Sequence, residues 1–564
     1  MAVLNGVVGL VVLLLVAVLA LVVKPPAPPG LAAFAPQANK TITKAPQQQS
    51  SNFGSGAGQC AAGQACNLLA TTTTSVPGVE RRGVPSALQC FKWPDGTVTQ
   101  TFDPQSPPCV AGWDNSKGNG GPTAAGVTQS EIRVALPMNS TSPTYPKLQP
   151  IVDFFNTHYQ FYGRKITIVP YTSQQASDDY TGAFDKPEDQ RADATQTTQL
   201  RVFASFDFVD PIHYSWSLPV YLDILARAKI VSINGGEMTP YGTSADLAAR
   251  YPYVWTYYTP IDSLMTTYAQ MVCRQLAGKP ASHAGNAVLR QTTRKFAVLM
   301  PEDADVGGAM PGLSTLLRGL GSCGINSPTV QRYHVGTGSE TTNSAWMSQL
   351  RRDGVTSMIW FPFVGSSQPS HPQQVASAIG YQPEWVTIGW NNYLTASNLN
   401  APANETGAEF GVGVWNKMPA IDLDFWHRAF LAAGGDQAVV NSGALTDGLA
   451  FYNEMLLLSA GIQMAGPNLT PDSFARGLRS TRFPNPGAGG PPFYQGTVGV
   501  GPDDVTMVKD FNGFWLDTRY TGAQVTSSSN LETDRAYCYP QLGRRFTGLT
   551  WPATDGYYAN GVCR

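Results

Sequence analysis

Short apolar runs alternate with helical stretches between residues 127 and 390, and this alternation constrains the fold more than any other feature. The first series has apolar runs at 131–137, 165–171, 203–210 and 229–235, with helical periodicity at 148–163, 188–202 and 218–229. The second series has apolar runs at 294–301, 329–335, 356–363 and 384–390, with helical periodicity at 261–278, 309–321, 344–354 and 372–380. Alternation of this kind predicts parallel sheets with helices on both faces. We therefore expect an α/β chain with two doubly wound, Rossmann-like lobes joined by several crossing segments.

The chain length also requires more than one core, since 564 residues exceed the roughly 250–300 at which a single core stops growing. Helical patterns at 445–466 and 469–480 follow both series and must pack on the earlier sheets. The expected organisation is a membrane segment (1–24), a low-complexity spacer with a small Cys-containing module (25–126), the first lobe (127–255), the second lobe (256–395), a return to the first lobe (396–485), and a return to the second lobe with a disulfide-stapled tail (486–564).

The N-terminus carries an uncharged apolar run at residues 6–23. At 1.5 Å per residue the run spans about 27 Å, close to the hydrocarbon core of a bilayer. No basic residue precedes it, which favours an uncleaved anchor over a cleaved signal peptide. Under either alternative the rest of the chain is exported.

Eight cysteines occur, and they lie in locally paired positions. Eight cysteines allow about 105 pairings. Local bridges in an oxidising compartment are the economical expectation. The expected pairs are Cys60 with Cys66, Cys90 with Cys109, Cys273 with Cys323, and Cys538 with Cys563. Metal ligation is the alternative, although no C-x-x-C occurs. A hairpin turning at Asp95-Gly96 is expected inside the N-terminal module.

Charge and motifs exclude several classes of function. The formal net charge is −2 and no basic block occurs, so no nucleic-acid partner is expected. The chain lacks the nucleophile-elbow, zincin, P-loop and dinucleotide fingerprints. Asp210, His213 and Ser215 form a hydrolase-like trio, but triads join distant segments rather than neighbours in one loop. We expect no enzymatic activity and no cofactor.

The stretch YPYVWTYYTP, at residues 251–260, separates the two series. We expect a strand that crosses between the lobes and is covered on both sides. Trp255 and Tyr257 share one face of such a strand, whereas Tyr258 or Thr259 would face a ligand.

Several segments resemble the type I periplasmic binding proteins, the substrate-binding subunits related to those for branched-chain amino acids. The resemblance lies in element order between about 127 and 520 and in five motifs: FYGRKITIVPY, KIVSINGGE, YVWTYYTPIDS, RKFAVLMPEDADVGGAM and LTPDSFARGL. It implies two lobes that close by a hinge, with a ligand cleft between the carboxyl ends of both sheets.

The resemblance also implies ligand-binding residues in the first lobe, in loops that would bind a carboxylate. These are His213, Tyr214, Ser215, Trp216, Ser232, Asn234 and Gly235, joined by Trp255 and Tyr258 on the crossing segment. A tight turn is the alternative for Gly235-Gly236.

In the second lobe the resemblance implies that Glu302 and Asp303 recognise a ligand ammonium, with capping of the following helix as the alternative. Val306 stands where the family has a Tyr, which argues against an amino acid as ligand. Phe361, Phe363 and Trp390 follow strands and suit a flat or apolar ligand surface.

The expected function is therefore that of an extracytoplasmic solute-binding protein of the bacterial cell envelope, secreted or membrane-anchored. Its ligand would be an amino acid, an amide, or an aromatic or apolar solute, and its partner an ABC-type permease. A membrane-tethered sensor or interaction protein on the same fold is the alternative.

Overall fold

A computed structural model describes the chain in sixteen segments. They are residues 90–92, 98–138, 145–174, 187–206, 219–234, 242–302, 312–333, 340–361, 372–389, 409–413, 425–441, 448–480, 499–501, 504–508, 511–517 and 536–538. The apolar run at 6–23 lies outside them, and no helix within them is long and apolar enough to span a bilayer.

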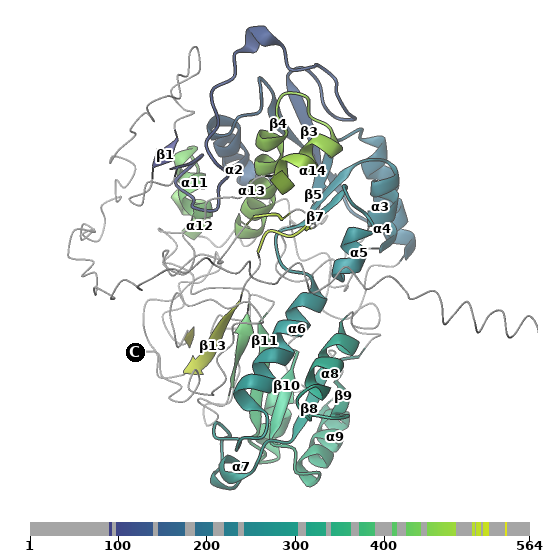
Figure 1. Cartoon of the computed structure of the whole chain (residues 1–564), viewed down its shortest axis with the longest axis vertical. Coiled ribbons are helices and arrows are strands. Elements are labelled where there is room, and N and C mark those ends of the chain that lie inside the picture. The colour runs from purple at the N-terminus through teal and green to yellow at the C-terminus, as the bar shows by residue number, and fades with distance from the viewer. Residues whose placement is uncertain are drawn as a thin grey trace, which may run out of the picture. The chain divides into compact units, whose positions relative to one another are not determined.

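The first sheet has five parallel strands in the order β4-β3-β5-β6-β7 (Figure 1). The strands are β3 (Glu131–Met138), β4 (Lys165–Thr172), β5 (Ala204–Phe206), β6 (Val231–Asn234) and β7 (Val254–Thr256). The connecting helices are α2 (Tyr145–His158), α3 (Pro187–Gln199), α4 (Pro219–Arg227) and α5 (Ser244–Ala248). The alternation along the sequence thus gives the expected parallel α/β unit, here called the first lobe.

Helices cover both faces of this sheet. On one face, the Ser205 hydroxyl lies 2.8 Å from the Tyr221 hydroxyl of α4. On the other face lie α13 (Gly448–Ala465) and α14 (Pro471–Ser480), late in the sequence yet beside the first sheet in Figure 1. Phe206, the next residue of β5, packs edge-on against Phe451 of α13 at 5.7 Å. Thr470 accepts a hydrogen bond from the Ser473 amide and so caps α14.

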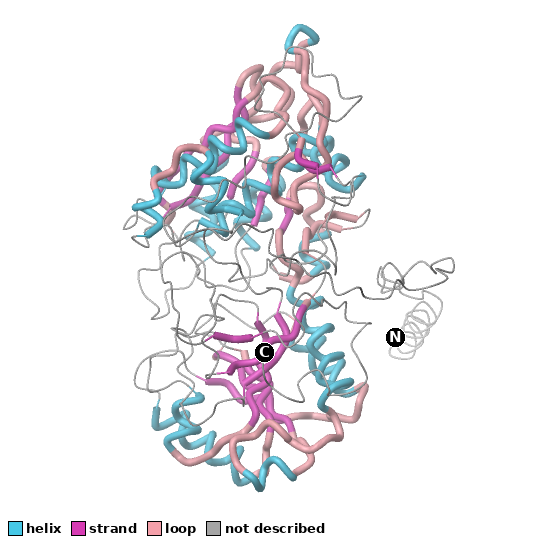
Figure 2. Tube along the Cα trace, turned by 90° about the vertical axis from the view of Figure 1, so that its left-hand side faces the viewer, coloured by secondary structure: helices cyan, strands magenta, loops and turns pink. Residues whose placement is uncertain are grey.

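The second sheet has seven strands in the order β14-β13-β12-β11-β10-β8-β9, seen side by side in magenta in Figure 2. The strands are β8 (Phe296–Pro301), β9 (Thr329–Tyr333), β10 (Ser357–Trp360), β11 (Glu384–Gly389), β12 (Glu409–Gly413), β13 (Asn512–Asp517) and β14 (Ala536–Cys538). β8 to β12 are parallel, β13 pairs antiparallel with β12, and β14 pairs antiparallel with β13. This sheet and its helices form the second lobe.

The remaining helices are short or belong to the second series. They are α6 (Ile261–Met271), continued by a π-helical turn (Val272–Leu276), α7 (Ala287–Gln291), α8 (Leu313–Gly321), α9 (Glu340–Arg352), α10 (Pro372–Ala378), α11 (Phe425–Ala432) and α12 (Gln437–Asn441). α6 packs against α8, and α11 packs against α2.

Two late segments differ from the expected organisation. Residues 409–413 were expected in the first lobe, but they form β12, which pairs with β11 of the second sheet. Residues 504–508 were expected in the second lobe, but they run beside β7: the Thr256 amide donates to Val505 O at 3.0 Å, and the Met507 amide donates to Thr256 O at 3.1 Å. A short apolar run predicts a strand without indicating which sheet edge it joins, and this explains both differences.

Two disulfides confirm two of the expected local pairs. Cys90 joins Cys109 and Cys273 joins Cys323, each with Cα atoms 5.6 Å apart. β1 (Phe91–Lys92) pairs antiparallel with β2 (Val98–Thr99), as a hairpin requires, while the expected turn at Asp95-Gly96 lies outside the described residues. Cys60, Cys66 and Cys563 lie outside the described residues, and Cys538 is described only as part of β14.

The segment 98–126, expected as part of a spacer, is instead packed into the first lobe. The buried Arg164 guanidinium holds it by donating to Asn119 O at 2.6 Å and Gly121 O at 3.0 Å, and it also donates to Thr128 O, just beyond the segment, at 2.7 Å. A fourth bond, to Pro467 O at 2.8 Å, ties in the α13–α14 connection. The polar composition of the segment is that of a linker, but its polar groups find partners inside the fold.

Candidate functional site

The carboxyl ends of β6 and β7 meet at one edge of the first sheet. The parallel register pairs Asn234 with Thr256, and the Tyr257 amide donates to Asn234 O at 2.7 Å. Side chains that leave neighbouring strands at this edge converge, and ligands of open α/β sheets bind outside such edges. The sequence therefore brings the backbones of Asn234 and Tyr257 together at this edge, and Tyr258 directly follows them.

Two buried polar side chains on β6 have no hydrogen-bond partner among the described residues. They are Ser232, through Oγ, and Asn234, through Oδ1, with 0% and 2% of their surfaces exposed. They lie two residues apart and so share one face of the strand. An unpaired buried polar group costs about 1–3 kcal/mol. A group that pairs with both atoms would remove this cost.

Tyr258, which follows β7, is hydrogen-bonded to a residue of α13. Its hydroxyl accepts a hydrogen bond from Nδ2 of Asn453 at 3.0 Å, and 6% of its surface is exposed. Asn453 lies on α13, a helix buried along almost its whole length. Sequence reasoning missed Asn453, although a polar residue within such an apolar helix is a signal that it has a specific partner.

Other predicted site residues lie in the core. Trp255 is fully buried, its indole N–H donates to Pro252 O at 2.8 Å, and its ring packs against Phe474 of α14 at 5.8 Å. Phe361 is fully buried as well, and its carbonyl accepts from the Tyr333 hydroxyl at 2.6 Å. These contacts pack both rings into the core, and their ligand role stays a prediction.

Glu302 directly follows β8, and its amide donates to Tyr333 O at 2.9 Å. The structure therefore places it at the carboxyl edge of the second sheet, and its ligand role stays a prediction. The remaining predicted site residues lie outside the described residues: His213, Tyr214, Ser215, Trp216, Gly235, Asp303, Phe363 and Trp390. Asp210, of the hydrolase alternative, also lies outside them.

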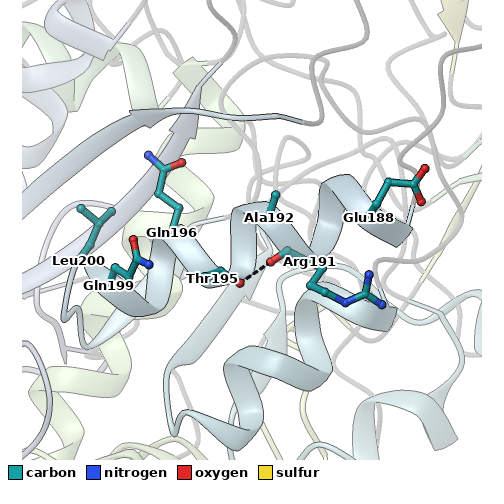
Figure 3. Close-up of a pocket in the computed structure, with 7 residues that line it drawn as sticks. All are labelled: Glu188, Arg191, Ala192, Thr195, Gln196, Gln199 and Leu200. Atoms are coloured by element: carbon teal, nitrogen blue, oxygen red, sulfur yellow. Dashed lines mark hydrogen bonds between the residues drawn. The ribbon is translucent and has the colours of Figure 1, made fainter.

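An open depression occurs on the surface of α3 (Figure 3). It is lined by Glu188, Arg191, Ala192, Thr195, Gln196, Gln199 and Leu200. None of the predicted site residues lines it. Within the described part of the chain, no cluster of three or more His, Cys, Asp or Glu side chains could hold a metal ion.

No family model and no curated protein matches the chain. Among solved structures, an ABC transporter solute-binding protein from R. palustris in complex with 4-hydroxybenzoate matches at 13% identity and a TM-score of 0.48, over 73% of this chain and 96% of that chain. A branched chain amino acid ABC transporter from Thermus thermophilus with bound valine matches at 12% identity and a TM-score of 0.47, over 74% and 96%. A fatty acid ABC transporter substrate-binding protein from Thermomonospora curvata matches at 13% identity and a TM-score of 0.47, over 76% and 96%. The structural neighbours of the chain are thus substrate-binding proteins of ABC transporters with the type I fold, at low sequence identity.

Proposed function

We propose that the chain is an extracytoplasmic solute-binding protein that captures a small molecule at the carboxyl edge of the first sheet, for an ABC-type uptake system. The observation that carries the proposal is the pair of buried, unpartnered polar atoms on Ser232 and Asn234 at that edge. Open α/β sheets bind ligands at this place, and buried polar atoms in folded proteins are otherwise paired.

The chemistry of the pair indicates what the ligand carries. Oδ1 of Asn234 can only accept a hydrogen bond, whereas the Ser232 hydroxyl can donate or accept. A ligand that satisfies both atoms supplies at least one N–H or O–H donor. Amino acids, amides and hydroxylated aromatic acids meet this condition, while a ligand with acceptors alone leaves Asn234 unpaired.

Export of the chain is part of the proposal. The two disulfides support it, because disulfides persist in oxidising compartments. The choice between an anchor and a cleaved signal depends on residues 1–24, outside the described residues. A carbonate wash of the membrane fraction tests it: an anchored protein stays with the membrane, and a cleaved one is recovered starting after residue 24.

Thermal unfolding with a ligand panel tests the binding proposal. The panel consists of amino acids, short amides, hydroxybenzoates and fatty acids, which include the molecules named for the structural neighbours. A ligand present at one hundred times its Kd stabilises the folded state by about 2.7 kcal/mol, and the melting temperature rises accordingly. If no member of the panel moves the melting temperature, solute capture for uptake is contradicted.

Asn234→Leu is expected to separate ligand binding from folding. Leu matches Asn in shape but has no polar atom, so the free protein should gain about 1 kcal/mol in unfolding free energy as the unpaired Oδ1 is removed. Ligand affinity should fall tenfold or more, since each factor of ten corresponds to about 1.4 kcal/mol. Urea unfolding and calorimetric titration measure the two effects.

The matched control is Asn115→Leu. Asn115 is exposed and lies beside Gly163, which precedes β4, so it sits at the opposite edge of the first sheet. This variant should leave affinity unchanged. Equal loss of affinity in both variants, or a destabilised Asn234→Leu protein with normal affinity, would show that Asn234 supports the fold and does not contact the ligand.

A further inference from the structure

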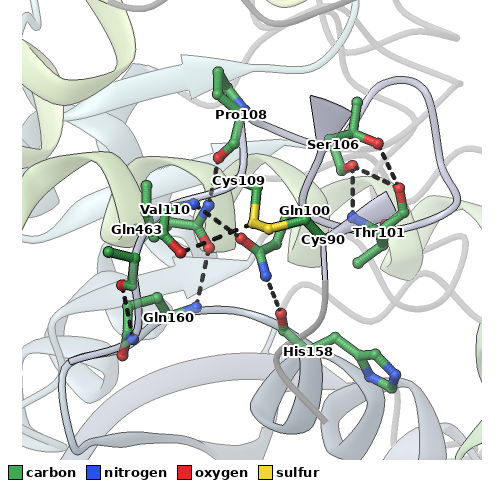
Figure 4. Close-up of a disulfide and its surroundings, with 12 residues drawn as sticks. Cys90, Gln100, Thr101, Ser106, Pro108, Cys109, Val110, His158, Gln160 and Gln463 are labelled. Atoms are coloured by element: carbon green, nitrogen blue, oxygen red, sulfur yellow. Dashed lines mark hydrogen bonds between the residues drawn. A yellow bond between two sulfur atoms is a disulfide. The ribbon is translucent and has the colours of Figure 1, made fainter. Parts of the chain in front are cut away.

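Residues 98–110, here called the N-terminal strap, are an internal part of the first lobe although they precede its first strand. Residues 99–107 are all buried. The strap is bound at one end through the Cys90–Cys109 disulfide, and Figure 4 shows the bonds around it. Nε2 of Gln100 donates to His158 O at 2.7 Å, and Nε2 of Gln463 donates to Pro108 O at 2.9 Å.

The strap accepts hydrogen bonds from two tyrosines that directly precede Asn453 and Tyr258 in the sequence. The Tyr452 hydroxyl of α13 donates to Oδ2 of Asp103 at 2.8 Å, and the Tyr257 hydroxyl donates to Oε1 of Gln105. Tyr258 is a predicted site residue, and Asn453 bonds to its hydroxyl. Displacing the strap would therefore remove a side-chain hydrogen bond from the residue that precedes each member of the Asn453–Tyr258 pair.

Asp103 is fully buried, and groups from several elements face it. Its Oδ1 accepts from the Gln105 amide at 2.8 Å within the strap. Around it lie Tyr452 of α13, Tyr159 after α2, and the Arg428 guanidinium of α11, which sits 4.2 Å above the Phe102 ring. Tyr257 approaches the same cluster beside Tyr452.

Burial raises the pKa of Asp103 to about 6, although the bonds from Gln105 and Tyr452 and the Arg428 charge oppose the rise. A released strap exposes the carboxyl to water, where its pKa returns to 3.8. Protonation therefore favours the docked strap. Between these two pKa values release becomes easier as pH rises, and above the higher one it no longer changes. Burial also lowers the pKa of His158, which lies next to the strap. Protonation of His158 therefore favours release of the strap, the opposite of the effect of protonating Asp103.

We propose that the N-terminal strap is a pH-dependent latch on the candidate site: Asp103 and Gln105 hold Tyr452 and Tyr257, fix the Asn453–Tyr258 pair, and hold it more firmly when Asp103 is protonated. As regulation of ligand binding, this proposal rests on the proposed function. As a property of the fold, it does not require a ligand.

Hydrogen exchange read by mass spectrometry tests the latch on the whole chain without a ligand. Peptides from 98–110 and 254–260 are followed between pH 4.5 and 7.5, corrected for intrinsic exchange. In the wild type the opening constant of both regions should rise on the order of tenfold, since one pKa unit corresponds to tenfold in the equilibrium. In Asp103→Asn this rise should disappear. Any pH dependence of the opening constant that remains in the variant reports the titration of His158, which is present in both proteins.

Two further variants complete the test. Asp114→Asn is the matched control, because the Asp114 carboxyl is exposed and caps a 3₁₀ turn at Asn115, outside the strap; it should keep the wild-type pH dependence. Tyr452→Phe removes a bond that lowers the pKa of Asp103, so its pH dependence should extend to higher pH. This variant keeps the test decisive if Asp103→Asn does not fold.

The latch is overturned if Asp103→Asn keeps the full pH dependence, or if the strap opens while 254–260 stays protected. If the panel has identified a ligand, its Kd should weaken from pH 4.5 to 7.5 in the wild type more than in Asp103→Asn. If it has identified none, the proposed function fails while the exchange result still decides the latch.

Discussion

Glu384→Gln is expected to destabilise the second lobe by about 3–5 kcal/mol, because it leaves a buried cation without its counter-charge. Nε and Nη2 of Arg294 donate to the two Glu384 oxygens at 2.7 and 2.9 Å, and both side chains are fully buried. The same carboxylate accepts from the Ser357 hydroxyl at 2.6 Å and the His283 amide at 2.9 Å. Gln would supply one oxygen to four donors and place an amide N–H₂ against the guanidinium.

Urea unfolding, with hydrogen exchange to locate the change in β8, β10 and β11, measures this effect. The double variant Arg294→Met with Glu384→Met should recover most of the loss, since apolar replacement of a whole buried pair is often neutral. Glu384 begins β11 and Ser357 begins β10, so the pair lies at the amino edge of the second sheet. Solute affinity should therefore be unchanged.

The control is Asp223→Asn. Arg250 Nε lies 2.7 Å from Asp223 Oδ1, but the Asp223 side chain is 49% exposed. Exposed pairs contribute about 0–1 kcal/mol, so this variant should hardly change stability. If Glu384→Gln costs no more than Asp223→Asn, burial does not govern the second-lobe pair.

The sequence predicted most strands and helices because each has a local pattern. KITIVPY alternates along β4, and the apolar runs of β8 and β10 are the continuous kind typical of strands covered on both faces. The edge assignments of 409–413 and 504–508 could not be predicted in this way. β12 pairs with β11, and the two strands approach so closely that a Cβ added to Gly411 would lie 1.8 Å from Thr387 O. The hydrophobic pattern of the sequence does not indicate this close approach.

The candidate site likewise contains residues that the sequence predicted and residues that only the fold reveals. Ser232 and Asn234 were predicted through the resemblance of KIVSINGGE to the type I periplasmic binding proteins, and their ligand role stays a prediction. Asn453 was missed, since its contact with Tyr258 joins residues far apart in the sequence. The strap was missed because Thr, Gln, Ser and Pro indicate a linker, and only the fold shows that Asp103 and Gln105 have buried partners.

Trp255→Ala is expected to cost about 3–5 kcal/mol of stability in the first lobe, as for other fully buried large side chains. The indole packs against Phe474 at 5.8 Å and against Tyr251 at 6.0 Å, and its N–H is bonded to Pro252 O. The variant leaves a cavity between β7 and α14, and it frees a carbonyl. Trp255→Phe should cost less, because it keeps most of the ring volume.

These variants decide whether the aromatic stretch at 251–260 serves the core or the ligand. A core role predicts that urea stability falls from wild type through Trp255→Phe to Trp255→Ala, while the affinity of the folded protein for a panel ligand stays within a few-fold. A ligand wall predicts the reverse, with affinity lost and stability kept. Tyr251→Ala is the matched control, because Tyr251 is 38% exposed and its ring stacks on Arg479 at 3.6 Å. An exposed cation–π contact contributes about 0.5–1 kcal/mol, so this variant should lose far less stability than Trp255→Ala.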